Sequence, residues 1–272
     1  DKLGRKMSKS LGNSPDPFDL IQKYGADGVR VGMLLSSPAG NDLPFDSSQC
    51  EQGRNFTNKI WNAFRLITSW EVKNFEQPKS SSVANDWLAS KLSRTILDLN
   101  EQFEKFRISE ALMTTYKFVW DDFCSLYLEM IKPGYQQPID QSTYNEAVKF
   151  FEIILKLIHP FTPFIAEEIW HLIKDRTDKD CVVIASWPVA EEVDDTLFSD
   201  FIFAEEIISN VRNTRKDKNI ANKVLVDLVA KENETFSKQF DPIIEKLGNL
   251  SSLTYTSEKV DNAFSFIVKS NE

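Results

Sequence analysis

Residues 46–70, DSSQCEQGRNFTNKIWNAFRLITSW, carry the clearest periodicity in the chain. Within them, apolar side chains recur at positions i, i+4, i+8 and i+11, namely at Phe56, Ile60, Phe64 and Ile67. This spacing places the four side chains along one stripe of an α-helix, the stripe that a globular protein buries. We therefore predict a long amphipathic helix over this stretch.

Three further helical patterns follow, over residues 87–106, 108–131 and 144–173. Pro160 and Pro163 should kink or divide the last of them, because proline lacks the N–H that a helix interior needs. Long helices in series, joined by short polar breaks, indicate an antiparallel bundle. The predicted fold class is therefore mainly α.

The two ends of the chain differ from this bundle. Residues 1–15, DKLGRKMSKSLGNSP, have the composition of a loop, and Asp16-Pro17 after them is typical of a helix start. From Asp178 onward the pattern changes to that of a small mixed α/β region, with a short strand over 182–184, helices over 199–216 and 232–247, and further strands over 224–229, 250–255 and 264–268. We divide the chain into a loop with connecting helices (1–45), the bundle (46–191) and the α/β unit (192–272).

The charge balance is acidic, with 32 Lys and Arg against 41 Asp and Glu in 272 residues, for a net charge of −9. Residues 137–272 carry the whole excess, with 15 basic and 24 acidic side chains. Such a chain is no general polyanion binder, so any contact with nucleic acid must come from local basic patches. No apolar run reaches the roughly 18 residues of a membrane span, and we expect no membrane contact.

The number and spacing of the cysteines indicate the cellular compartment and whether a zinc site is expected. Cys50, Cys124 and Cys181 share no CxxC spacing. An odd number of widely separated cysteines argues against a disulfide framework or a zinc site and suits a reducing compartment. We therefore expect a cytoplasmic protein with no bound metal. Separately, we expect a monomer.

The strongest chemical signal is the run Lys6-Met7-Ser8-Lys9-Ser10. Two ammonium groups three residues apart on a loop, with hydroxyl donors beside them, can close over a triphosphate and neutralise charge on its leaving group. The nine glycines form neither a GxGxxG motif nor a P-loop that could bind a nucleotide instead. The alternative interpretation is a solvated basic loop.

The same five residues, followed by Leu11-Gly12-Asn13, resemble the second signature motif of class I aminoacyl-tRNA synthetases. Further segments narrow the resemblance to the valyl-tRNA synthetases, and the similarity extends over nearly the whole chain. These segments are YGADGVR (24–30), GRNFTNKIWNA (53–63), WDDFC (120–124), HPFTPF (159–164) and VRNTR (211–215).

The resemblance implies a two-step reaction in the whole enzyme. Valine attacks ATP, which is a substrate accompanied by Mg²⁺, to form valyl-adenylate, and the terminal ribose of tRNA(Val) then accepts the valyl group. Lys6 and Lys9 are the implied catalytic residues, and the implied ATP-binding loop is Lys6, Met7, Ser8, Lys9 and Ser10. The family's HIGH-type motif, amino-acid pocket and editing domain are expected upstream of Asp1, so we expect this chain alone to be inactive and to hold no cofactor.

One face of the helix over 46–70 is a candidate tRNA-binding surface, because between Gln52 and Trp70 it holds three basic residues and no acid. This face lies beside the apolar stripe and could contact phosphates and unpaired anticodon bases. Alternatively, its tryptophan belongs to the core and its asparagines cap or bridge helices. The candidate residues are Arg54, Asn58, Lys59, Trp61, Asn62 and Arg65.

A second candidate edge carries Arg212, Arg215 and Lys216 in an otherwise acidic region. This edge either contacts RNA or is merely solvated.

His159 precedes a proline in an apolar stretch, which favours a satisfied core histidine over a base or a ligand. Asp121 and Asp122 have no nucleophile nearby in the sequence, which favours a surface or inter-helix role over acid–base work.

Two other functions stay open at this point. The chain could be the same region of an isoleucyl- or leucyl-tRNA synthetase, although the GRNF and NKIWNA segments favour the valine enzyme. It could also be a non-catalytic helical RNA-binding or scaffold module, which would give Lys6 and Lys9 no role.

Overall fold

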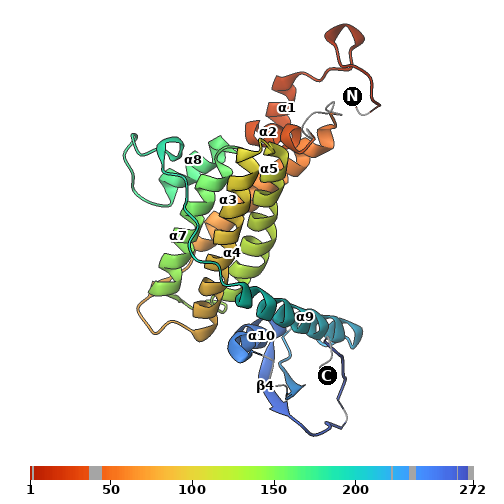
Figure 1. Ribbon diagram of the computed structural model, residues 1–272, viewed down its shortest axis with the longest axis vertical. Helices are drawn as coiled ribbons and strands as arrows, with labels where there is room; N and C mark the ends of the chain where they lie inside the picture. Colours follow the sequence, from red (N-terminus) through yellow and green to blue (C-terminus); the bar gives the residue numbers. More distant parts are fainter. Residues whose placement is uncertain (2, 37–44, 222, 233–236, 262, 269–272) are drawn as a thin grey trace.

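The computed structural model describes residues 1, 3–36, 45–221, 223–232, 237–261 and 263–268. Figure 1 shows an elongated molecule in which a bundle of long helices follows the long axis. The N-terminal segment projects beyond one end of the bundle, and a small C-terminal unit lies at the other end. The predicted fold class, a mainly α chain with an antiparallel bundle and a small α/β unit, is confirmed.

The N-terminal end consists of α1 (Pro17–Tyr24) and α2 (Ala26–Leu35), which pack against α3 (Ser47–Thr68). Asp16 caps α1 as predicted, since its carboxylate accepts the N–H two residues on at 2.8 Å. Asp46 caps α3 in the same way at 2.9 Å. The helix over 46–70 is thus confirmed, and its stripe is at most 9% exposed at Phe56, Ile60, Phe64 and Ile67.

Glycines let α2 and α3 cross at very short range. A Cβ atom placed on Gly53 would lie 2.2 Å from the carbonyl oxygen of Gly28, and one placed on Gly32 would lie 2.6 Å from the backbone nitrogen of Cys50. Because both neighbours are backbone atoms, no side-chain rotation could make room. The crossing therefore ties the N-terminal segment to the bundle.

The rest of the bundle is α4 (Lys79–Glu104), a helical segment over 108–131, α7 (Gln141–Ile158) and α8 (Pro163–Leu172). The predicted division of the pattern over 144–173 is confirmed, because α7 ends before Pro160 and α8 begins at Pro163. A two-residue parallel pair, β1 (Val72–Lys73) and β2 (Ile139–Asp140), joins two loops and was not predicted.

The segment over 108–131 is helical throughout, as predicted, but its hydrogen-bond spacing changes. It comprises α5 (Ile108–Lys117), a π-helix η2 (Phe118–Tyr127) and α6 (Leu128–Ile131). The hydroxyl of Ser125 donates to the carbonyl of Trp120, five residues earlier, at 2.7 Å. The sequence pattern predicted a helix here but not its wider turns, because π-helical turns are rare and occur mostly as short insertions within α-helices.

The C-terminal unit consists of α9 (Asp195–Asp217), β3 (Val226–Lys231), η4 (Lys238–Phe240), α10 (Asp241–Gly248) and β4 (Leu250–Thr256). Strands β3 and β4 pair in parallel, with Leu228 opposite Leu253, and α10 makes the crossover. Both α9 and α10 pack against α4, and the rings of Trp87 and Phe201 lie 4.5 Å apart. The core of this unit is thus continuous with that of the bundle, and the three-part division of the chain remains a prediction.

Three local predictions for this end of the chain need correction. Val182–Ile184 is a 3-10 helix (η3) and not a strand, because no described strand lies beside it to accept its hydrogen bonds. Over 264–268 only an isolated bridge residue forms, at Val268. The helix predicted over 232–247 begins only at Asp241, and residues 233–236 of that prediction lie outside the described part of the chain. Across the described helices, none is both long and apolar enough to span a membrane.

Candidate nucleotide loop and nucleic-acid interface

The loop with Lys6 and Lys9 projects beyond α1 and is held by its own polar side chains (Figure 1). The side-chain amide of Asn13 donates to the Lys6 carbonyl at 3.2 Å, and its Oδ1 accepts the Ser8 N–H at 3.0 Å. The Ser8 hydroxyl accepts the Leu11 N–H and lies 3.1 Å from the Ser10 hydroxyl. These contacts shape a single 3-10 turn, η1 (Lys9–Leu11), that Gly12 closes with φ of 62°.

The loop presents its two candidate catalytic lysines to solvent. Lys6 and Lys9 are both exposed, and neither takes part in an ion pair within the described residues. Arg5, in contrast, is paired with Asp1 at 2.7 Å. Met7 points the other way and packs with Leu20 against a small cluster that includes Tyr24 and Val29. The arrangement thus anchors the loop through its methionine and leaves two ammonium groups available to an anionic ligand.

The candidate RNA-binding face of α3 is a solvent-facing row beside the buried stripe. Its exposed members are Arg54, Asn58, Asn62 and Arg65. The guanidinium of Arg54 also donates to the carbonyl of Lys23 at 3.3 Å, which links α3 to α1. Cationic and amide side chains in one exposed row can contact phosphates and base edges, so this row has the chemistry that an RNA contact needs.

Lys59 and Trp61 lie at the border of that row and are partly buried. The indole of Trp61 packs on Phe64 with ring centroids 5.3 Å apart, so it belongs in part to the core, as the alternative interpretation held. The ammonium of Lys59 lies 5.2 Å from the centre of the Trp120 ring. Trp120 in turn stacks on Tyr116 at 5.5 Å and 8°.

The stack of Tyr116 and Trp120 is a feature that sequence reasoning missed. Both rings are partly buried and lie on the helical segment next to α3. Their spacing of four residues on one helix would have been the signal, since i and i+4 side chains share a face. Aromatic rings with a cation alongside are the usual platform for unpaired bases.

The second candidate edge is only partly on the surface. Arg215 is 4% exposed, and its guanidinium donates to four backbone carbonyls, those of Gly248, Ala221, Val224 and Asn249. A cation committed to these acceptors is not available to RNA, so for Arg215 the expectation of an RNA contact is wrong and its role is structural. Arg212 is exposed and donates one bond, at 3.2 Å, to the Leu247 carbonyl.

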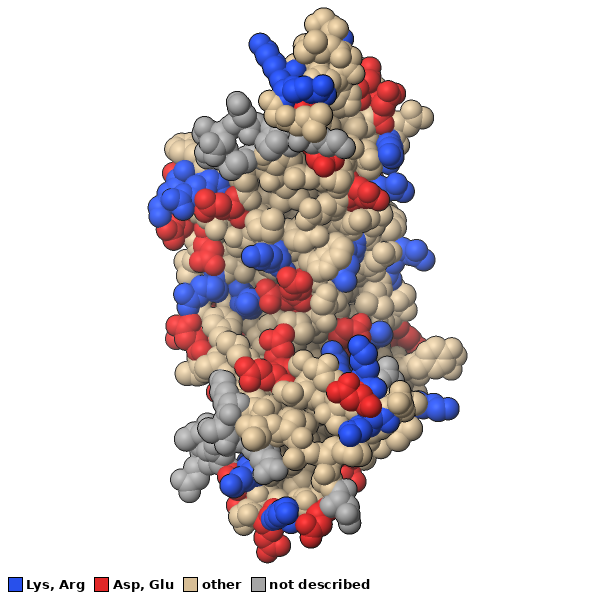
Figure 2. All heavy atoms as spheres, turned by 90° about the vertical axis from the view of Figure 1, so that its right-hand side faces the viewer, with Lys and Arg blue, Asp and Glu red and all other residues tan. Residues whose placement is uncertain are grey.

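The charged face seen in Figure 2 supports local contacts only. Basic and acidic side chains alternate along its whole length, and neither sign gathers into a broad patch. A blue group stands at the upper end, where Figure 1 places the N-terminal segment. The absence of a general basic surface on this face agrees with the acidic composition.

Two other candidates from the sequence behave differently. Burial raises the pKa of Asp122 to about 6, and the Lys91 ammonium 3.5 Å away opposes that rise. This contact fits the inter-helix role expected of Asp122.

His159 is only half-buried, and its Nδ1 is a buried atom without a hydrogen-bond partner in the described structure. The expectation of a satisfied core histidine is therefore wrong.

Comparison with known proteins gives consistent matches along the chain. Residues 85–230 match the family described as the anticodon-binding domain of tRNA ligase, and residues 1–46 match the class I tRNA synthetases of the I, L, M and V group. The chain is 54% identical to a valine–tRNA ligase of Christiangramia forsetii and 50% identical to one of Parabacteroides distasonis. Each alignment covers 100% of this chain but 31% of the relative, so the chain spans about a third of the length of the curated relatives it matches.

A solved structure supports the fold. The LeuRS–tRNA–LeuAMS ternary complex of Agrobacterium radiobacter aligns over 70% of this chain and 23% of that chain, with a TM-score of 0.51 and 21% sequence identity. The family match spans more than half of the chain, from within α4 to within β3, and so includes most of the helices of the described bundle. The chain therefore belongs to the family of anticodon-binding domains of tRNA ligases.

Proposed function

We propose that the chain is the part of a valine–tRNA ligase that holds the ATP-binding loop and binds the anticodon arm of tRNA(Val). The observation that carries the proposal is the physical connection between the lysine loop and the exposed row of α3. The loop with Lys6 and Lys9, which are exposed and form no ion pair with any described residue, leads into α1 and α2. These helices meet α3 at the glycine crossing, and α3 presents the row of Arg54, Asn58, Asn62 and Arg65. Sequence identity to valine–tRNA ligases over the whole chain supports valine as the amino acid.

The proposed chemistry assigns separate roles to these groups. Lys6 and Lys9 stabilise the negative charge that builds on the pyrophosphate of ATP as valine attacks the α-phosphate, with Mg²⁺ accompanying the nucleotide. Met7, Ser8 and Ser10 hold the loop in shape through the contacts described above. The whole enzyme then transfers the valyl group to tRNA. We place this activity in the cytoplasm, in agreement with three free cysteines, and we propose a monomer.

The role of the loop is tested by Lys9→Ala in the full-length ligase. We expect valine-dependent ATP–pyrophosphate exchange to slow by about 10²–10³-fold, the usual effect of removing one transition-state charge partner. Lys23→Ala, which removes an exposed ammonium from the end of α1, is the matched control and should leave the rate unchanged. An unaltered exchange rate in Lys9→Ala would refute the catalytic role of Lys9 and favour the alternative of a non-catalytic scaffold. Exchange that depends on isoleucine or leucine would favour an isoleucyl- or leucyl-tRNA synthetase.

The role of α3 is tested by tRNA binding at two salt concentrations. Arg65→Ala should weaken binding of tRNA(Val) and lower the slope of log affinity against log salt by about 1 if Arg65 contacts a phosphate. The control is Arg94→Ala, because Arg94 is also an exposed arginine but lies on α4, outside the exposed row of α3, and pairs with Asp195 of α9. Equal effects of the two substitutions would mean that only the overall charge matters and that α3 is not the contact surface.

A further inference from the structure

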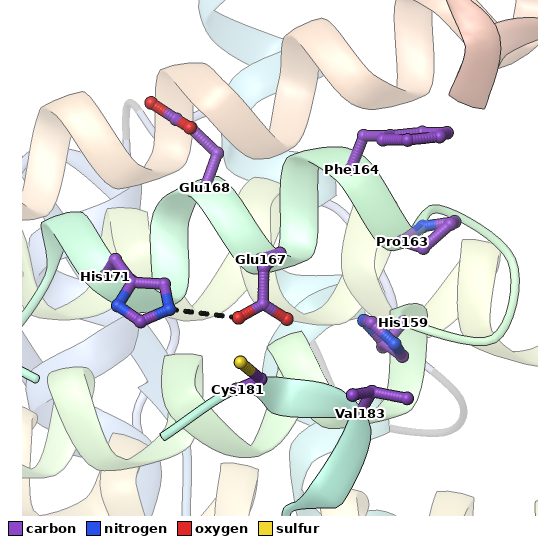
Figure 3. Close-up of a pocket in the computed structure, with 8 residues that line it drawn as sticks. All are labelled: His159, Pro163, Phe164, Glu167, Glu168, His171, Cys181 and Val183. Atoms are coloured by element: carbon purple, nitrogen blue, oxygen red, sulfur yellow. Dashed lines mark hydrogen bonds and ion pairs between the residues drawn. The ribbon is translucent and has the colours of Figure 1, made fainter. Parts of the chain in front are cut away.

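A pocket of about 530 Å³ opens beside α8 (Figure 3), and its lining includes no residue of the loop or of the exposed row of α3. Glu167 and His171 project into it from α8, and Cys181 faces them from the segment that follows this helix. His159, whose buried Nδ1 has no hydrogen-bond partner among the described residues, also lines the pocket. None of these side chains has a part in the proposed function.

Three potential metal ligands meet in this pocket. Glu167 and His171 are four residues apart and so share one face of α8. Their side chains are joined by a contact of 3.0 Å between Oε1 and Nε2. One ligand atom from each of Glu167, His171 and Cys181 lies within 4.8 Å of the other two.

The pocket is assembled by contacts that do not involve the three ligands. The Arg176 guanidinium lies 3.8 Å from the centre of the Trp170 ring and pairs with Glu152 of α7. The Trp170 indole N–H donates to the Asp180 carbonyl at 2.9 Å. These contacts dock the segment over 176–180 on α8 and so bring the next residue, Cys181, to the pocket.

The carboxylate of Glu167 is also oriented in advance. Its Oε2 accepts the backbone N–H of Val182 at 3.0 Å, which leaves Oε1 on the side of His171. A hydrogen bond of this kind to a ligand is the usual device that fixes a coordinating group. The ligands thus need little reorganisation to bind an ion.

Carboxylate, imidazole and thiolate together are a set that suits Zn²⁺, which takes oxygen and nitrogen at about 2.0–2.2 Å and sulfur at about 2.3 Å. In a tetrahedral site the ligand atoms are then roughly 3.3–3.6 Å apart. The Oε1 of Glu167 and the Nε2 of His171 are already 3.0 Å apart, so closure of the site requires the Cys181 thiol to approach by at most about 1 Å, which rotation of partly exposed side chains can supply. The pocket is open, so water can fill the fourth position.

We propose that Glu167, His171 and Cys181 form a binding site for a divalent cation of the Zn²⁺ class, which fastens the segment over 176–182 to α8. This site is independent of the nucleotide loop and of the RNA-binding row. It also revises the expectation of no metal, which rested on the absence of a CxxC spacing. The competing explanation is a simple helix ion pair between Glu167 and His171 with a cysteine nearby.

Titration of the metal-free chain with Zn²⁺ and with Co²⁺ tests the proposal. We expect one equivalent of Zn²⁺ to bind in calorimetry and Co²⁺ to give a thiolate-to-metal charge-transfer band. Because Cys50 and Cys124 are buried, that band would report Cys181. Cys181→Ser should abolish the band and weaken Zn²⁺ binding at least about tenfold, and His171→Gln should weaken it to a similar extent.

The matched control is Glu168→Gln, since Glu168 lines the same pocket but is not one of the three ligands. This variant should bind Zn²⁺ as the unaltered chain does. Circular dichroism of each variant would verify folding, and His171→Gln remains informative if Cys181→Ser does not fold. Binding that is unchanged in both ligand variants, or equal losses in all three variants, would overturn the proposal.

Discussion

Replacement of Gly53 by alanine tests whether the close crossing of α2 and α3 holds the N-terminal segment to the bundle. The new Cβ atom would stand 2.2 Å from the carbonyl oxygen of Gly28 and 3.0 Å from its carbonyl carbon. Since a comfortable contact needs more than 3 Å, the two backbones must separate by about 1 Å. A gap of that size removes roughly a quarter to a half of the dispersion energy of the atoms that face each other across the crossing.

Two terms of opposite sign decide the outcome. Overpacking against rigid backbone costs about 3 kcal/mol, the upper end of the usual range, because neither partner is a side chain that could rotate away. Alanine in a helix interior is favoured over glycine by about 1 kcal/mol. The net expectation is a loss of about 2 kcal/mol of unfolding free energy, or a fall of roughly 4–8 °C in Tm for a chain of this size.

Urea and thermal denaturation followed by circular dichroism measure this loss, and hydrogen exchange locates it. We expect protection to fall in α1 and α2, which pack against α3, and to persist in α7 and α8. Gly134→Ala is the control, because its Cβ would meet only the Gln137 side chain, at 3.4 Å, and its stability should stay within about 0.5 kcal/mol. A Gly53→Ala chain as stable as the unaltered one, or more stable, would refute the reasoning, since helix propensity alone would then decide the sign.

Two other substitutions test buried charges. Arg215→Met should destabilise the C-terminal unit by about 2–4 kcal/mol, because four carbonyls lose a charged donor. The control Arg212→Ala should change the stability little. Equal unfolding curves for the two variants would contradict this. Burial raises the pKa of Asp122 from 3.8 to about 6. Between these two values the folded state binds more protons than the unfolded state. The free energy of unfolding should therefore fall as pH rises from about 4 to 6. Asp122→Asn should lack this component, worth up to about 3 kcal/mol, and parallel pH profiles for the two proteins in denaturant titrations would argue against it.

Features that depend on neighbouring residues alone were predictable. The stripe of Phe56, Ile60, Phe64 and Ile67 predicted α3, and the prolines at 160 and 163 predicted the gap between α7 and α8. Helices obey a local period and local start and stop signals, so one sequence carries enough information to place them. The loop with Lys6 and Lys9 was recognisable for the same reason, since all five of its residues are consecutive.

Features that depend on distant partners were not predictable. The Val182–Ile184 run has strand-like residues, but no strand among the described residues pairs with it, and β-structure exists only where a second strand is present. Arg215 has the sequence of a surface cation, yet it is covered because the carbonyls of Gly248 and Asn249 lie against α9 in the folded unit.

The pocket beside α8 depends most strongly on contacts between segments that are distant in the sequence. Glu167 and His171 are close in sequence, but Cys181 lies ten residues beyond His171 and forms no motif with it. The contact of Arg176 with Trp170 and Glu152 brings the cysteine back to the helix. Local helices, their caps and a contiguous motif follow from the order of the residues, whereas pairing, burial of charge and the meeting of ligands arise only when packing brings remote segments together.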